Sequence, residues 1–330
     1  MRLFALLFAV AACTTEHDPD LTPPLDPPSV PDEHPVALQG PLAVHDHLVL
    51  ALDDLVADPQ ALTQYLHDYA NAPGATMLAA ADAAHVPALA TLRAQLSPGL
   101  QTSLPGWFDE SVTALSRLGV AGLETGVAHA LKKFDLVGEL RVDGGDADNP
   151  HVQHAVTSID FTPMGYPQTF DLVAGDDETL TAETDGSFSG SSLSMSEHTL
   201  VVDAGGYAWD AVDAQIADRG GIRGMLSDLT MCNLVALSVA TKCNGNECVG
   251  HADLIQAICE GAVNEIADGG REQAAALKLK LVLAGTVGVD DQNRDQIGDG
   301  LFAGTWNATV SVGENAPAPM TFRFDSNVGD

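Results

Sequence analysis

Basic side chains are scarce in this sequence. Lys and Arg together number 14 against 46 Asp and Glu, which gives a formal net charge of −32. Nucleic acids and anionic lipid head groups are themselves negative, so they repel a chain this acidic. The composition therefore argues against nucleic-acid binding. It favours basic partners, divalent cations or a saline environment, or a surface whose acidity serves solubility alone.

The sequence also lacks the short motifs that mark common catalytic and redox sites. It has no P-loop, no Gly-x-Gly-x-x-Gly run after a predicted strand, no His-Glu-x-x-His pair and no Cys-x-x-Cys pair. Residues 186–190 have the glycines of a hydrolase elbow, but Phe188 stands where the nucleophilic serine would be. We therefore expect a protein that is not an enzyme. A hydrolase site assembled from dispersed residues is an alternative.

The apolar run at the N-terminus is too short to be a membrane span. It has Arg2, a brief apolar core and small residues before Cys13, whereas a transmembrane helix needs about 20 residues. This pattern predicts a signal peptide over residues 1–12. Val10-Ala11-Ala12-Cys13 resembles the bacterial lipobox, which implies that Cys13 is acylated and becomes the new N-terminus. An ordinary signal peptide is the alternative, and it would leave Cys13 as an odd thiol.

The resemblance to lipoproteins also implies a location. Thr14 and Thr15 follow Cys13, whereas enteric lipoproteins that stay on the inner membrane carry aspartate there. We therefore expect an exported protein on the outer membrane or cell surface, held in the membrane through its lipid anchor. Two or three acyl chains are enough for stable anchoring.

Residues 13–35 are predicted to be a tether. Prolines alternate there with acidic residues, and large apolar side chains are almost missing. Such a segment cannot bury a core and is expected to be extended and disordered. The whole layout, from lipobox and tether to paired cysteines and closing Gly-x-Trp strands, resembles uncharacterised predicted lipoproteins. That resemblance implies no activity.

Four cysteines near residue 245 predict two disulfides. Cys232 and Cys243 are eleven positions apart, as are Cys248 and Cys259, and eleven residues on a helix return to nearly the same face. Residues 231–240 and 252–263 read as buried helices, with the turn formers Asn244-Gly245-Asn246 between them. In an antiparallel helical hairpin, two residues that face each other have sequence numbers that add up to the same total for every facing pair. That condition pairs Cys232 with Cys259 and Cys243 with Cys248.

A zinc site is the alternative use of these cysteines. Zinc needs four sulfurs around one ion at about 2.3 Å. On two helices the inner and outer cysteine pairs would be about 16 Å apart, so one ion could not reach both. The spacing therefore favours nested disulfides, which also require an oxidising compartment and agree with export.

The remaining sequence predicts an α+β fold that packs as one unit. Residues 36–133 read as a helical region, with Ser97-Pro98 as one helix start and Pro73-Gly74 as a break. From residue 134 to 330 the apolar period becomes two, which predicts an antiparallel sheet, curved or barrel-like, with a helical insertion over 206–270.

Details of the alternation predict local features of the sheet. Val152, His154 and Val156 occupy even positions but Ile159 is odd, which predicts a β-bulge near Thr157–Ser158. Three alternating runs in the last sixty residues predict an antiparallel meander. The middle run places Phe302 on the same face as Trp306.

An acidic loop between two of these strands is a candidate calcium site. Its possible oxygen ligands resemble the calcium loops of thrombospondin type 3 repeats and dockerins in their alternating spacing. They are Asp291, Asn293, Asp295 and Asp299. Gln296 stands where those loops have glycine, and Phe302 stands where an EF-hand has glutamate. A solvated acidic turn is the alternative.

Histidines form two loose clusters, His45-Asp46-His47 and His151-Val152-Gln153-His154. No third metal ligand accompanies them, so we expect structural or surface histidines. The leading hypothesis is a non-catalytic lipoprotein that serves as a binding or structural module. Its partner would be an envelope protein or a hydrophobic ligand held between the helices and a curved sheet. A calcium-stabilised adhesion or matrix protein and an envelope hydrolase are the alternatives.

Overall fold

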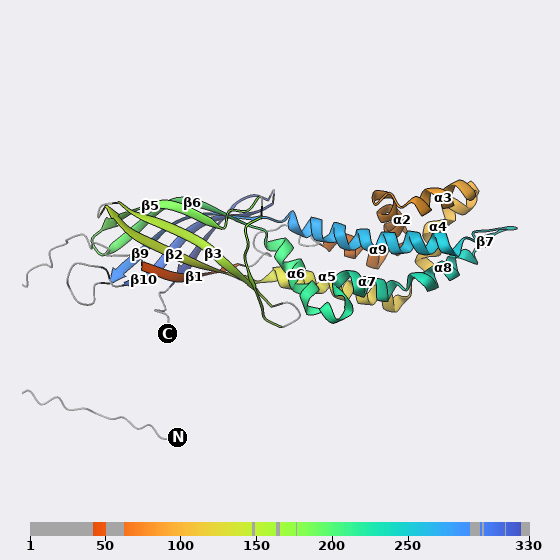
Figure 1. Cartoon of the computed structure of the whole chain (residues 1–330), viewed down its shortest axis with the longest axis horizontal. Coiled ribbons are helices and arrows are strands. Elements are labelled where there is room, and N and C mark those ends of the chain that lie inside the picture. The colour runs from red at the N-terminus through yellow and green to blue at the C-terminus, as the bar shows by residue number, and fades with distance from the viewer. Residues whose placement is uncertain are drawn as a thin grey trace, which may run out of the picture. The chain divides into compact units, whose positions relative to one another are not determined.

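The computed structural model describes residues 42–50, 63–146, 149–162, 166–175, 177–290, 298, 300–313 and 315–324. All of them belong to one compact unit that spans residues 35–330. It combines an antiparallel sheet with two helical segments (Figure 1). The predicted α+β class is confirmed.

The described part of the sheet has nine strands in the order β1-β2-β3-β5-β6-β9-β10-β11, with β4 paired to β3 outside this path. Every pairing is antiparallel, and β1 lies close to β11, so the sheet is nearly barrel-shaped. The strands are β1 (Leu42–Leu50), β2 (Phe134–Asp146), β3 (Asn149–Phe161), β4 (Gln168–Asp171), β5 (Thr181–Ser189), β6 (Ser192–Val202), β9 (Leu279–Asp290), β10 (Gly300–Val312) and β11 (Ala318–Phe324).

The helices come in two segments of the chain. The first comprises α1 (Gln64–Asn71), α2 (Pro73–Ala83), α3 (Pro87–Gln95), α4 (Pro98–Ser111) and α5 (Ala114–Lys132). The second comprises α6 (Ala204–Gln215), α7 (Gly221–Thr230), α8 (Cys232–Ala240) and α9 (Ala252–Ala275), with a short 3-10 turn, Ala217–Arg219, before α7. Helices of the two segments pack on each other, with α9 against α2 and α5 against α6.

Strand β1 corrects the prediction that residues 36–133 are a helical region. Within Leu42–Leu50, Val44, Asp46 and Leu48 are buried while His45 and His47 are exposed. That alternation has the period of a strand, and β1 pairs with β2 along its whole length. The described helices therefore begin at Gln64.

The predicted β-bulge in β3 is confirmed. Val137 pairs with Ser158, but the next residue, Gly138, pairs with Val156. Thr157 is therefore the extra residue, and the buried positions change from even to odd numbers beyond it.

The closing meander β9-β10-β11 also agrees with the prediction, except at Phe302. The register of β10 on β9 shifts between Phe302 and Thr305, next to Ala303 with a φ of 48°. Leu301 is only 3% exposed while Phe302 is 47% exposed. The irregularity therefore turns Phe302 to the outside, opposite to Trp306.

Helix α8 is less buried than expected. Val235 and Val239 face the core, but Leu234 and Leu237 are exposed. Residues Gly221–Ala240 together have a mean hydropathy of 1.2 and the length to cross a membrane, with 39% of the stretch buried; the bent pair α2–α3 passes the same test. Core helices of soluble proteins also meet this criterion, so it assigns no membrane span.

Both predicted disulfides are present. Cys232 on α8 joins Cys259 on α9 with a Cα–Cα distance of 5.5 Å, and Cys243 joins Cys248 at 3.9 Å. The inner pair is not on helices, which corrects part of the geometric argument. It closes a small hairpin of β7 (Cys243–Asn244) and β8 (Glu247–Cys248) around Gly245, whose φ is 63°.

The two disulfides are expected to differ in their contribution to stability. Cys232 and Cys259 are separated by 27 residues and Cys243 and Cys248 by 5. The loop-entropy relation then predicts losses of about 3.5 kcal/mol for the outer pair and about 2 kcal/mol for the inner pair. Urea unfolding of the double variants Cys232→Ala/Cys259→Ala and Cys243→Ala/Cys248→Ala measures both. A larger loss for the inner pair would contradict this explanation.

Candidate functional site

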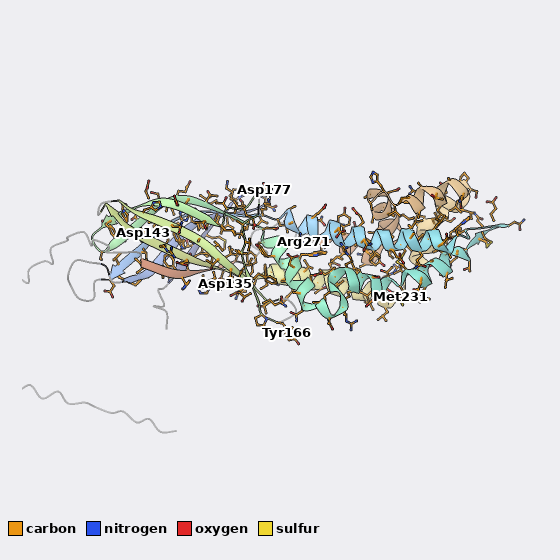
Figure 2. The ribbon with its side chains drawn as sticks, in the orientation of Figure 1. Asp135, Asp143, Tyr166, Asp177, Met231 and Arg271 are labelled. Atoms are coloured by element: carbon orange, nitrogen blue, oxygen red, sulfur yellow. A yellow bond between two sulfur atoms is a disulfide. The ribbon has the colours of Figure 1, made fainter. Side chains whose placement is uncertain are left out.

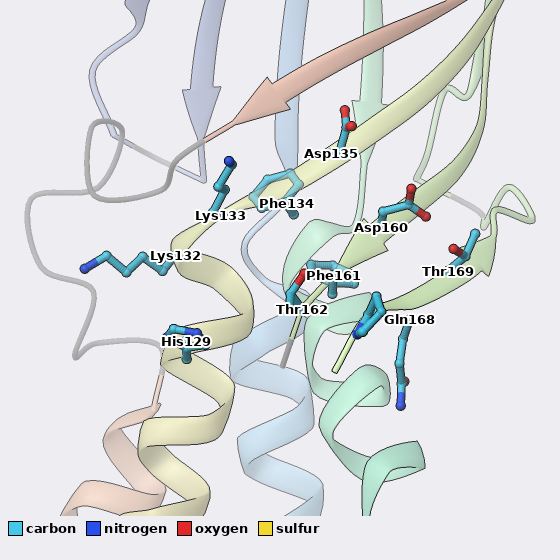
Figure 3. Close-up of a pocket in the computed structure, with 11 residues that line it drawn as sticks. His129, Lys132, Lys133, Phe134, Asp135, Asp160, Phe161, Thr162, Gln168 and Thr169 are labelled. Carbon is cyan, nitrogen blue, oxygen red and sulfur yellow. The ribbon is translucent and has the colours of Figure 1, made fainter. Parts of the chain in front are cut away.

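A cavity of about 820 Å³ lies where the first helical segment meets the sheet (Figure 3). Its volume is within the range of small-molecule sites in proteins. The residues that line it come from the end of α5, from β2, β3 and β4, and from the chain between β3 and β4. They are His129, Lys132, Lys133, Phe134, Asp135, Asp160, Phe161, Thr162, Pro167, Gln168 and Thr169.

Aromatic rings stand at the back of this cavity. Helix α5 ends at Lys132 and β2 begins at Phe134, so the helix end is brought directly to the sheet. Phe134 pairs with Phe161 across β2 and β3, and their ring centroids are 5.7 Å apart. Phe134 is 2% exposed and Phe161 is 1% exposed, so the two rings pack directly behind the lining and present little surface to the cavity.

Two carboxylates lie next to these rings. Asp135 and Asp160 are direct cross-strand partners, and in Figure 3 they lie on the same side of Phe134. The Oδ1 atom of each is buried and has no hydrogen-bond partner within the described residues. Like charges in directly opposite positions destabilise a sheet. The arrangement is therefore costly for the protein on its own.

The environment of Asp135 raises the pKa of its carboxyl group. Burial is the largest cause, and the neighbouring charge of Asp160 acts in the same direction. A contact from His47 Nδ1 to Asp135 Oδ2 at 3.2 Å and the charge of Lys133 partly oppose this rise. The side chain is thus held between an acidic and two basic neighbours.

A cluster of four side chains with polar atoms is enclosed by the sheet. Asp46, His154, His198 and Trp306 come from β1, β3, β6 and β10, and Asp46 and His154 are 0% exposed. Trp306 Nε1 donates to Asp46 Oδ2 at 2.9 Å. The His154 ring stacks on Trp306 with a centroid distance of 4.8 Å, and its Nδ1 lies 2.9 Å from His198 Nε2.

The hydrogen-bond partners assign the protons of this group. His198 Nδ1 faces the Ser196 carbonyl oxygen at 3.2 Å, and a carbonyl can only accept, so Nδ1 carries the proton. A neutral His198 then accepts from His154 Nδ1. His154 Nε2 is 3.1 Å from Asp46 Oδ2, too poorly aligned for a hydrogen bond but within ion-pair distance.

This enclosed group is suited to structure rather than to catalysis. A substrate cannot reach His154 or Asp46, because neither has exposed surface. Within the described ranges, no three His, Cys, Asp or Glu side chains are placed to hold a metal ion. The contacts instead tie the edge strand β1 and strand β10, which is next to the other edge, to β3 and β6 in the middle of the sheet.

The histidine clusters of the sequence are separated in the structure. His45 and His47 are exposed, and His47 contacts Asp135. His151 is also exposed and lies 3.7 Å from Glu183, whereas His154 points into the sheet. The partner of His154 is His198, which the sequence gave no reason to select because it stands alone on its strand.

Several predicted site residues lie outside the described residues. They are Cys13, Asp291, Asn293, Asp295 and Asp299. The calcium site and the acylation of Cys13 therefore stay predictions. The cavity, by contrast, was anticipated only as a space between helices and a curved sheet, without its residues.

The pKa of His198 predicts a dependence of stability on pH. Burial and the neighbouring His154 lower it from 6.5 to about 4. The unfolded chain therefore takes up a proton at His198 before the folded protein does. The stabilisation is fully present above pH 6.5 and is lost as pH falls toward about 4.

Urea unfolding of the wild type and of His198→Gln at pH ~7 and pH ~4 measures this loss, which should be about 3 kcal/mol larger in the wild type. His45→Gln, at an exposed histidine of β1, is the matched control and should retain the wild-type dependence. Equal losses in the wild type and His198→Gln would contradict the assignment.

Comparisons with known proteins identify no relative of this chain. No protein-family model, no curated protein and no solved structure matches it.

Proposed function

We propose that this protein is a non-catalytic lipoprotein of the outer membrane or cell surface that binds a small amphiphilic molecule. The observation that carries the proposal is the cavity of about 820 Å³ between α5 and the sheet. Cys13 would anchor the protein, residues 13–35 would form its tether, and the folded unit would hold the ligand.

The lining of the cavity supports an amphiphile over a purely polar or purely apolar ligand. Pro167 and the methylene stems of Lys132 and Lys133 give the lining apolar surface, and Phe134 and Phe161 pack directly behind it. Carboxylates, a hydroxyl and an amide complete the lining. Sites for small molecules commonly combine an apolar lining with a few polar groups that set the orientation of the ligand.

The disulfides support export. Cys232–Cys259 and Cys243–Cys248 use four of the five cysteines in the chain. Disulfides of this kind persist in oxidising compartments. The fifth cysteine is Cys13, the residue that a lipobox would modify.

The placement of the histidines favours a binding role over a hydrolase. His154 and Asp46 resemble a catalytic pair only in residue type. Both are enclosed, and the Asp46 carboxylate accepts a hydrogen bond from the Trp306 indole. A hydrolytic group must reach its substrate within hydrogen-bond distance.

Partly filling the cavity should weaken binding of an apolar probe. The wild type is expected to bind Nile red saturably, with a rise in its fluorescence. Thr169→Trp places an indole in the cavity and should weaken binding about tenfold, the loss for displacing ~60 Å² of apolar contact at ~25 cal/mol/Å². Thr181→Trp introduces the same ring at an exposed position of β5 and should bind as the wild type does.

Two outcomes would contradict the proposed site. Wild-type binding that does not saturate would show adsorption rather than a site. Equal affinity in Thr169→Trp and Thr181→Trp would place the dye elsewhere on the protein.

Acylation at Cys13 is tested in a bacterium that processes lipoboxes. The full-length protein should incorporate labelled palmitate and fractionate with membranes, and Cys13→Ser should lose the label and the membrane association, since one thiol is the acceptor. Cys243→Ala/Cys248→Ala is the control for loss of cysteine and should keep the label. A wild-type protein without label would contradict the lipid anchor.

A further inference from the structure

The charges around the cavity allow its ligand to be specified. We infer that the cavity binds a zwitterionic amphiphile, with a cationic ammonium group at Asp135 and Asp160 and an anionic group at the end of α5. This inference rests on the proposed function and names the class of its ligand.

The acidic side of the cavity would be stabilised by a cation. Asp135 and Asp160 face each other across β2 and β3, and each keeps its Oδ1 buried without a hydrogen bond among the described residues. A buried acceptor without a donor is costly, and two adjacent carboxylates add repulsion. An ammonium group beside the exposed part of the pair would offset the repulsion between the two carboxylates. The Asp135 side chain is 31% exposed, so part of it is open to such a group.

The opposite side of the cavity carries basic groups. His129, Lys132 and Lys133 come from the last turn and the C-cap of α5, where the full positive charges of the two lysines exceed the partial negative charge of the helix end. In Figure 3, His129 and Lys132 lie on one side of Phe134, and Asp160 and Thr169 lie on the other. Lys133 is near enough to lower the pKa of Asp135. The acidic and basic side chains therefore lie on opposite sides of Phe134.

A ligand with a single charge fits this arrangement poorly. A simple cation would meet the basic end of α5, and a simple anion would meet two carboxylates in a protein whose formal net charge is −32. A zwitterion can match both sides at once, and its apolar chain can lie in the cavity against Pro167 and the methylene stems of the lysines. A phosphocholine-type or amino-acid-type head group has this chemistry.

A set of amphiphiles with the same apolar chain tests the inference. Nile red displacement compares dodecylphosphocholine, dodecyl phosphate, dodecyltrimethylammonium and dodecyl maltoside, each below its micelle-forming concentration. We expect dodecylphosphocholine to bind most tightly, about tenfold more tightly than dodecyl maltoside, because one charged contact contributes roughly a factor of ten.

Variants that each remove one charge show which side of the cavity binds which charged group of the ligand. Asp160→Asn should weaken dodecylphosphocholine and dodecyltrimethylammonium about fivefold and leave dodecyl maltoside unchanged, and Lys133→Gln should weaken dodecylphosphocholine and dodecyl phosphate similarly. Asp143→Asn removes the same charge at the other end of β2 (Figure 2) and should change none of them. Asp160→Asn also removes a like-charge pair, so its thermal unfolding should occur at or above the wild-type temperature.

The outcomes separate this inference from the proposed function. If no dodecyl compound displaces Nile red, the amphiphile site itself is wrong. If all four displace it equally, or if Asp160→Asn and Asp143→Asn behave alike, the cavity binds amphiphiles but the zwitterion is wrong. Tightest binding of dodecyltrimethylammonium, without an effect of Lys133→Gln, would replace the zwitterion by a simple cation.

Discussion

The nearly barrel-shaped sheet depends on one buried contact, from the Trp306 indole to the Asp46 carboxylate. Strand β1 is hydrogen-bonded to β2 and β11 to β10, but no ladder between β1 and β11 closes the described sheet. The 2.9 Å bond from Trp306 Nε1 therefore joins the first strand to the last hairpin through side chains. A hydrogen bond to a charged acceptor contributes about 1.5–3 kcal/mol. Because both groups are enclosed, breaking it would also leave a carboxylate stranded in the core.

That contact requires space on the neighbouring strands. A Cβ atom at Gly138 would stand 2.0 Å from Asp46 Oδ1, and one at Gly285 would stand 2.4 Å from the Trp306 ring. Gly304 leaves similar room for Phe324, which stacks on Trp306. The core of the sheet is thus a large indole and a polar group placed against glycines. The same arrangement orients His154, which is parallel to the indole and held by His198.

The parts of this fold that follow from nearby residues could be predicted, and the parts that depend on distant partners could not. The bulge at Thr157 and the nested disulfides follow from a phase change and from cysteine spacing within short stretches. Strand β1 is hard to predict for two reasons: its alternation covers only 9 residues, and its partner β2 follows only after five helices. The cavity was harder still, because its lining residues come from a helix end and three strands that only the tertiary fold assembles. His198 has no sequence signal, whereas Asp46 could have been found as an acid at a buried position of an alternating strand.

Both helical segments are excursions from paired strand ends. Leu50 at the end of β1 pairs with Phe134 at the start of β2, and Val202 at the end of β6 pairs with Leu279 at the start of β9. Each excursion therefore returns to the place where it left, and the helical layer is assembled from two separate loops of the chain that must find each other. The sheet registers can form only if both long loops close, which slows folding because the loop entropy is lost before the contacts form. A molecule bound next to Phe134 would lie where the first helical excursion rejoins the sheet. It would therefore contact a helix end and the sheet strands at the same time.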